Sequence, residues 1–208
     1  MEGANIRIID LRTGETLAEG RTEGETGNTK LLVQDSGTRY GKLAGDGDAE
    51  FNTVLKLTEP TKIQIIASAP LRSPNNMISI SNELWMIPGK HIDGDGFIME
   101  MPGLSVKIQE PLQYLSEEDK LEIKAEVIML CGCPTEPEGL WDSSEMDIEV
   151  WLYRDGQMIL RSDMNYTGRN STYAAALSIP EAGEYQVYVT ASDPRTANSG
   201  VDSVLITY

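Results

Sequence analysis

The sequence predicts an all-β protein made of two tandem antiparallel β-sandwiches. Its 208 residues are enough for two units of roughly 100 residues, each with a core of its own. Apolar and polar residues alternate along many short stretches, as in half-buried strands, and helical periodicity is nearly absent. We therefore expect a first sandwich over residues 1–90, a linker over residues 91–103 and a second sandwich over residues 104–208. One larger sandwich is the alternative.

An internal repeat supports the division into two units. Residues 49–67 and 171–189 match at a constant spacing of 122 residues. The matched pairs are Phe51 with Tyr173, Leu55 with Leu177, Leu57 with Ile179, Glu59 with Glu181, Gln64 with Gln186, and Ile65 with Val187. Each copy alternates, turns at a proline and alternates again, which is typical of two antiparallel strands. A duplicated unit explains this most simply, and two unrelated hairpins are the alternative.

A hairpin is predicted around Asp155-Gly156, which separates two alternating stretches at residues 148–153 and 157–160. In the first stretch Ile148, Val150 and Leu152 form the better core face, and Trp151 shares the opposite face with Glu149 and Tyr153. Further strands are expected at residues 6–10, 29–34, 104–108 and 121–130, and a single helical turn at residues 116–120.

The second half of the chain carries a resemblance to immunoglobulin-like and fibronectin-type modules. Pro180-Glu181-Ala182-Gly183-Glu184-Tyr185-Gln186-Val187-Tyr188-Val189 resembles the turn and penultimate strand of such a domain. The resemblance implies that Tyr185 forms a tyrosine corner, with its hydroxyl bonded to upstream backbone. Val187 stands where an antibody-type domain has a cysteine, so the usual inter-sheet disulfide is not expected. The expected fold is therefore two tandem immunoglobulin-like antiparallel β-sandwiches.

The charge of the chain excludes two classes of partner. Asp and Glu number 33 against 17 Lys and Arg, for a formal net charge of −16. Such a chain repels phosphate backbones and anionic lipid headgroups, so we expect no nucleic acid partner. No apolar run approaches the ~20 residues that cross a bilayer, so we expect no membrane insertion. We expect an extracytoplasmic protein, on the assumption that a signal peptide has been removed, with a cytoplasmic location as the alternative.

The sequence carries no recognisable catalytic set. Its single histidine, His91, lies in a glycine-rich stretch expected to be an exposed loop, whereas most hydrolase sites need histidine as a base or a ligand. No glycine-rich phosphate loop precedes a predicted helix. We therefore expect no catalytic residue and no enzymatic activity.

Three sulfur atoms lie close together in the sequence, at Met129, Cys131 and Cys133. They lie at the end of the strand expected over residues 121–130, where alternation places all three on one face. Soft sulfur ligands suit Cu(I), a strained disulfide between the two cysteines would be redox-active, and structural thiols or a structural disulfide are the simpler interpretation. All three interpretations stay open.

Glycine-spaced carboxylates at Asp93 and Asp95 resemble those of calcium loops. The pattern lacks the further ligands of an EF-hand, so a solvated turn is the alternative. No cofactor is expected, with Ca²⁺ at these residues or Cu(I) at the sulfur cluster as the two possible ions.

These features predict a non-catalytic protein that presents sandwich surfaces for assembly or adhesion. We expect it to bind a protein partner or to form a homo-oligomer. Two alternatives remain open. One is a copper- or redox-handling accessory protein that uses Met129, Cys131 and Cys133. The other is a carbohydrate-binding module that uses exposed aromatic residues such as Trp85, Trp141 and Trp151.

Overall fold

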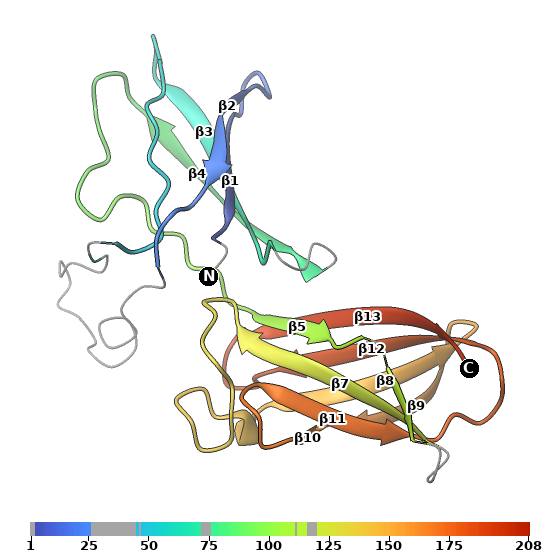
Figure 1. Ribbon diagram of the computed structural model, residues 1–208. Helices are drawn as coiled ribbons and strands as arrows, with labels where there is room; N and C mark the ends of the chain where they lie inside the picture. Colours follow the sequence, from blue (N-terminus) through green and yellow to red (C-terminus); the bar gives the residue numbers. More distant parts are fainter. Residues whose placement is uncertain (1–2, 26–44, 46, 72–75, 111, 116–119) are drawn as a thin grey trace. The chain divides into compact units, whose positions relative to one another are not determined.

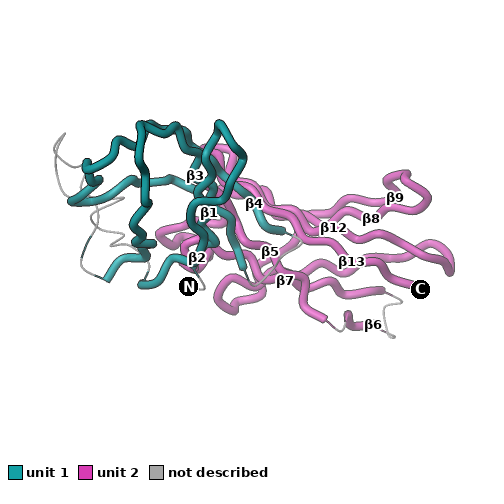
Figure 2. The backbone as a smooth tube through the Cα atoms, turned by 90° about the horizontal axis from the view of Figure 1, so that it is seen from above, with its two compact units in different colours: residues 1–101 teal, residues 102–208 magenta. Residues whose placement is uncertain are grey.

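The computed structural model describes residues 3–25, 45, 47–71, 76–110, 112–115 and 120–208. Within these residues the protein is all-β, with three antiparallel sheets and no α-helix (Figure 1). The chain divides into two compact units, Met1–Met101 and Pro102–Tyr208 (Figure 2). The expected linker over residues 91–103 spans the boundary between them. No helix in the described part of the chain is long and apolar enough to span a membrane.

The first unit contains one four-stranded sheet with the strand order β2-β1-β3-β4. Its strands are β1 (Asn5–Asp10), β2 (Thr16–Arg21), β3 (Thr61–Ala69) and β4 (Ile78–Met86). One face of this sheet is buried, at Ile8, Ile63 and Ala67. The ring of Phe51 lies on this sheet at Gly20, where a Cβ atom would be 2.4 Å from the ring. The absence of a side chain at Gly20 makes room for the ring.

In the first unit, residues 51–57 have the alternation of a strand, but they pair with no strand in the described part of the chain. Phe51 and Leu55 are half-buried on the expected side, and Val54 between them is exposed. The expected strand at residues 29–34 lies outside the described residues, as does the helical turn expected over residues 116–120 except for Lys120.

The second unit contains two sheets. The strands of the first are β5 (Leu104–Ile108), β6 (Gln113–Leu115), β7 (Lys120–Met129), β10 (Asn165–Tyr166) and β11 (Thr172–Leu177). They run in the order β10-β11-β7-β5, and β6 also pairs with β7. The strands of the second are β8 (Asp147–Arg154), β9 (Gln157–Asp163), β12 (Glu184–Ser192) and β13 (Ser199–Thr207), in the order β13-β12-β8-β9. A short 3₁₀ helix, η3 (Ser143–Glu145), precedes β8.

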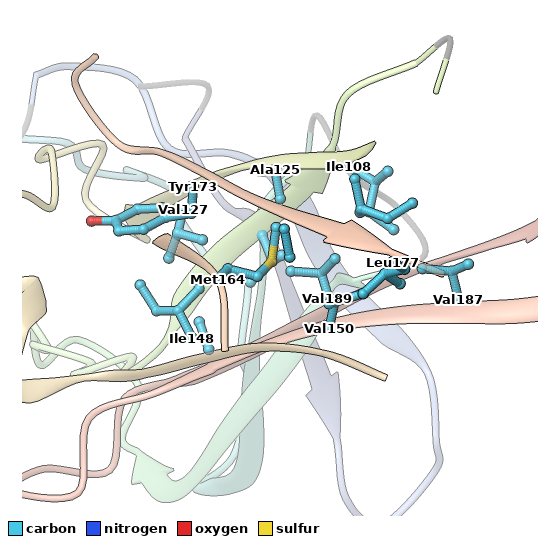
Figure 3. Close-up of a cluster of buried hydrophobic side chains, with 14 of the residues drawn as sticks. Ile108, Ala125, Val127, Ile148, Val150, Met164, Tyr173, Leu177, Val187 and Val189 are labelled. Atoms are coloured by element: carbon cyan, nitrogen blue, oxygen red, sulfur yellow. The ribbon is translucent and has the colours of Figure 1, made fainter. Parts of the chain in front are cut away.

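The two sheets of the second unit share one apolar core (Figure 3). Val127 and Tyr173 come from one sheet, and Val150 and Val189 from the other. In β8 the alternation predicted from the sequence is confirmed, because Ile148, Val150 and Leu152 are buried and Trp151 is not. In β7, β8, β11 and β12 buried residues alternate with more exposed ones, so one side of each strand faces the shared core and the other faces the surface.

The predicted hairpin at Asp155-Gly156 is present as β8–β9. Both turn residues have positive φ, 51° and 75°. These angles fit the type I′ turn that this dipeptide favours, because its twist matches that of the two strands it joins. Local sequence alone therefore specifies this turn.

The sheet of the first unit and the β13-β12-β8-β9 sheet have the same plan. In each, two hairpins join through antiparallel pairing of their first strands, β1 with β3 and β8 with β12. Ile9 pairs with Gln64, and Tyr153 pairs with Gln186, the glutamines matched in the sequence repeat. The first hairpin of each sheet, β1–β2 and β8–β9, also has a bulge directly before this rung, after Ile8 and after Leu152. The register of the two sheets therefore agrees down to the position of the irregularity.

Candidate functional site

Half-buried aromatic side chains lie on the side of the β13-β12-β8-β9 sheet that faces away from the core of the second unit. Alternation places them there, because the neighbouring residues Val150, Leu152 and Val187 are fully buried. We call this surface the outer face and define it by Trp151, Tyr153, Gln186, Tyr188, Thr190, Val201 and Leu205. It draws on three strands of one sheet, so its side chains stand on a hydrogen-bonded frame.

The outer face contains a hollow of about 760 Å³. Its lining combines three aromatic residues (Trp151, Tyr153, Tyr188), two carboxylates (Asp155, Glu184), two aliphatic residues (Val201, Leu205), two uncharged polar residues (Gln186, Thr190) and Gly156. Among the described residues, no lysine, arginine or histidine belongs to this lining. The hollow therefore combines ring surface and aliphatic surface with negative charge.

One rung of the sheet holds a cation–π pair beside the hollow. Trp151 pairs with Arg161 on β9 and with Tyr188 on β12. The guanidinium carbon of Arg161 lies 5.0 Å from the centre of the Trp151 ring. Arg161 also bonds Glu149, which raises the pKa of the guanidinium, and the Trp151 indole N–H donates to the same carboxylate at 3.1 Å. These contacts fix the orientation of the indole ring.

The corresponding surface of the first unit carries more polar side chains, alongside Ile9, Ile66 and the exposed Trp85. The hydroxyl oxygens of Ser68 and Ser79 are 2.7 Å apart, and the Gln64 amide donates to Ser81 Oγ at 3.4 Å. The Ser68–Ser79 bond lies within one rung, and the Gln64–Ser81 bond runs diagonally between the same two strands.

The two surfaces differ most at the rung that carries Trp151 and Tyr188. In the first sheet the matching rung holds Arg7 and Ile66. The arginine places positive charge where the second sheet has an indole ring. Two sheets with one backbone plan therefore differ in chemistry at this rung, which makes the rung of the first sheet a control inside the same chain.

The sulfur cluster predicted from the sequence lies at the end of β7. That strand ends at Met129, and a turn at Leu130 and Cys131 reverses the chain so that the Met129 N–H donates to the Cys133 carbonyl at 3.0 Å. Gly132 has a φ of 87°, which suits glycine. Alternation therefore does not continue through the three residues. Met129 is buried in the core, and the half-buried Cys131 and Cys133 pack against that core as thiols.

The pKa of the Cys131 thiol is raised. Burial raises its pKa to about 11, and the hydrogen bond with the Cys133 side chain acts in the same direction. Because the thiolate is the form that attacks electrophiles and binds metals, about one Cys131 in a thousand is reactive at pH 8. A metal ion at this turn would have to displace that proton.

Alkylation of Cys131 by iodoacetamide should therefore be slow at pH 8 and should rise about tenfold for each pH unit up to pH 10. The raised pKa moves the thiolate to high pH, so the rate has no plateau in this range. Fragment-resolved mass spectrometry separates Cys131 from Cys133, and the urea-unfolded chain supplies the control with an ordinary thiol. A rate that levels off below pH 9.5 would contradict the shift.

Asp93 and Asp95 lie in the turn over residues 93–96, where the Gly96 N–H donates to the Asp93 carbonyl at 3.4 Å. Asp93 is exposed and Asp95 is half-buried. No group of three or more acidic, cysteine or histidine side chains gathers as a metal-binding set in the described part of the chain. His91 is exposed in the same segment. Calcium binding by Asp93 and Asp95 therefore stays a prediction from the sequence.

The three tryptophans occupy different settings. Trp85, on β4 of the first unit, is 62% exposed. Trp141 packs against the core of the second unit, and its indole nitrogen is buried without a hydrogen-bond partner. Trp151 alone of the three lines the hollow. A carbohydrate site would therefore have to use Trp151 together with the tyrosines of the outer face.

Tyr185 is almost fully buried at 1% exposure. Its hydroxyl donates to the Glu181 carbonyl at 2.8 Å, which is the upstream backbone contact of a tyrosine corner. Its ring also receives the guanidinium of Arg154, at 5.5 Å, and Arg154 forms an ion pair with Glu181. This residue supports the fold beside the outer face and does not line the hollow.

Sequence reasoning placed Trp151 and Tyr153 on one face but missed their partners. Tyr188 lies between Val187 and Val189, both fully buried, so alternation identifies it as surface. The pairing of Tyr188 with Trp151 depends on the register between β8 and β12. No local pattern contains that register, and the hollow becomes apparent only in three dimensions.

No protein-family model matches the chain, and no curated protein matches it either. The structure itself therefore gives the class of the protein. It is an all-β protein of antiparallel sheets, and one sheet carries a hollow lined by aromatic and acidic side chains.

Proposed function

We propose that this is a non-catalytic extracytoplasmic binding protein, and that the outer face is its contact surface in assembly or adhesion. The observation that carries the proposal is the hollow lined by the half-buried aromatic side chains of Trp151, Tyr153 and Tyr188. Aromatic residues are enriched where proteins bind partners, because they bury large areas at low entropic cost. The hydrogen-bonded serine surface on the matching sheet indicates that the sheet plan itself does not require such residues.

The strand order supports an immunoglobulin-type fold for the second unit. An immunoglobulin sandwich places its first, second, fifth and fourth strands in one sheet and the remaining strands in the other. The two sheets β5-β7-β11-β10 and β9-β8-β12-β13 follow that order if β6 and β9 are counted as additions. The matched bulges and the sequence repeat support the further proposal that the first unit is a duplicated relative.

The site itself favours binding over catalysis. The hollow lies on the face of a sheet and is lined by side chains of three strands and one turn. An arrangement of this kind offers contact area to a surface group. It is suited to recognition of a partner, in which an aromatic centre is surrounded by a polar rim.

Hydroxyl-radical footprinting tests whether the outer face is occupied in its native setting. The 208-residue chain is oxidised both as the purified protein and in an extract of its source. We expect Trp151, Tyr153 and Tyr188 to be protected in the extract relative to the purified chain. Trp85 supplies the matched control, because it is exposed on the other unit and should be oxidised equally in both samples.

A Tyr188→Ala variant makes the test specific to the outer face. If a partner contacts the side chain of Tyr188, this variant should lose the protection of Tyr153 from oxidation in the extract. Equal oxidation of the three aromatic residues in both samples of the unaltered chain would contradict the proposal. Protection confined to Trp85 would instead assign the contact to the first unit.

A further inference from the structure

We infer that the hollow of the outer face binds the arginine or lysine side chain of a basic protein segment. This inference rests on the proposed function and adds the chemistry of the partner. Three properties of the hollow lead to it: the sign of its charge, the arrangement of its rings and the aliphatic surface beside them.

Charge favours a cation at this position. Asp155 and Glu184 contribute carboxylates to the lining, and no basic side chain lines it in the described residues. The neighbouring arginines are engaged elsewhere, Arg161 with Glu149 and Arg154 with Glu181. The whole chain adds a net charge of −16, which attracts a basic partner over distance.

The rings provide a surface that attracts a cation directly. Tyr153 and Tyr188 have centres 5.6 Å apart and planes at 83°, so they form the two sides of a corner within the hollow. An aromatic face carries partial negative charge, and cations are attracted to it within about 6 Å. Trp151 on the same sheet already receives a guanidinium from Arg161 at 5.0 Å. The same chemistry is open to a cation supplied by a partner.

The aliphatic wall distinguishes a basic side chain from a small ion. Val201 and Leu205 line the hollow and are 43% and 57% exposed. Arginine and lysine carry an apolar stem that packs along such a surface while the charged head reaches polar groups. A metal ion would leave these two side chains without a role.

The matching surface of the first unit lacks the aromatic residues on which the inferred binding depends. At the rung that matches Trp151 and Tyr188 it has Arg7 and Ile66, and at the position of Leu205 it has Glu83. Ile9 stands at the position of Tyr153, so none of the three rings of the hollow is present at these positions, and Arg7 places a positive charge there. A basic segment should therefore bind the second sheet alone.

The test uses a short capped peptide that alternates arginine and leucine, and the same peptide with citrulline, a neutral isostere, in place of arginine. Each is titrated into the ¹⁵N-labelled 208-residue chain while amide shifts of Gln186, Tyr188 and Thr190 are followed. We expect the arginine peptide to bind at least about tenfold more tightly than the citrulline peptide. The affinity should fall as salt is raised.

Three variants assign the effect. Tyr188→Ala should weaken binding of the arginine peptide about tenfold, and Tyr188→Phe, which keeps the ring, should retain it. Glu184→Gln should weaken binding less than Tyr188→Ala, because it removes only one charge at the edge. Ile66→Ala on the matching rung of the first sheet should leave the affinity unchanged.

Equal affinity for the arginine and citrulline peptides would overturn the inference, and so would the absence of shifts with the arginine peptide. Stronger binding of a neutral oligosaccharide such as cellohexaose to the same amides would overturn it in favour of a carbohydrate ligand. The footprinting result is independent of these titrations. Protection of the outer face in the extract together with a negative arginine titration would keep the contact surface and reject only the cationic partner.

Discussion

Replacing Gly200 with alanine should destabilise the second unit by about 3 kcal/mol, near the upper end of the cost of overpacking. A Cβ atom at this position would lie 2.1 Å from the carbonyl oxygen of Leu104 and 2.8 Å from its carbonyl carbon. Both are backbone atoms of β5, so no side-chain rotation relieves the clash. Urea unfolding followed by circular dichroism measures the loss.

Strand β5 has little freedom to move away from Gly200. The Gly103 N–H donates to Asn198 Oδ1 at 2.7 Å, and the Ile108 N–H donates to Asp202 Oδ2 at 2.8 Å. These two bonds hold β5 against β13 on either side of the close approach. Ser203→Ala is the control, because Ser203 is exposed on the same strand and its loss should change stability by less than about 0.5 kcal/mol. A Gly200→Ala variant as stable as this control would contradict the geometry.

Replacing Leu152 with alanine should cost roughly 2–5 kcal/mol, the range for a large aliphatic side chain removed from a packed core. Leu152 has no exposed surface and belongs to the core that both sheets of the second unit share. Hydrogen exchange should accelerate in β7, β11 and β12, which provide the surrounding core residues. The matched variant is Ile8→Ala, since Ile8 holds the equivalent buried position on β1.

The two variants should have separate effects. Ile8→Ala should accelerate exchange in β1 and β3, because those strands make up the sheet that it supports. Exchange measured by mass spectrometry resolves the strands within one sample. Equal acceleration of both units by either variant would contradict the division of the chain at residues 101 and 102.

The all-β class was predictable because alternation is local and strong. In β8 every second residue is buried, and the Asp155-Gly156 turn has the positive φ angles that its residues favour. Alternation wrongly placed Cys131 on one face with Met129 and Cys133, because that prediction assumed that the strand continued. The turn after Met129 breaks the period, and only the backbone conformation at Gly132 reveals this.

The candidate site was predictable only in part. Trp151 and Tyr153 could be assigned to one surface from their spacing, but Tyr188, Val201 and Leu205 join them through pairing between strands that are distant in sequence. Residues 51–57 show the opposite problem. They have the alternation of a strand, yet alternation names no partner, and strand formation depends on one.

The bulges after Ile8 and Leu152 separate the frame of each sheet from the surface that it displays. A bulge fixes the register of its hairpin, because a slip by one residue would exchange core and solvent sides. With that register fixed at the same rung in both sheets, surface residues can be exchanged without disturbing the pairing beneath them. Each sheet is thus a scaffold whose surface side chains can be replaced. The substitutions Arg7→Trp and Ile66→Tyr would begin to transfer the aromatic surface to the first unit.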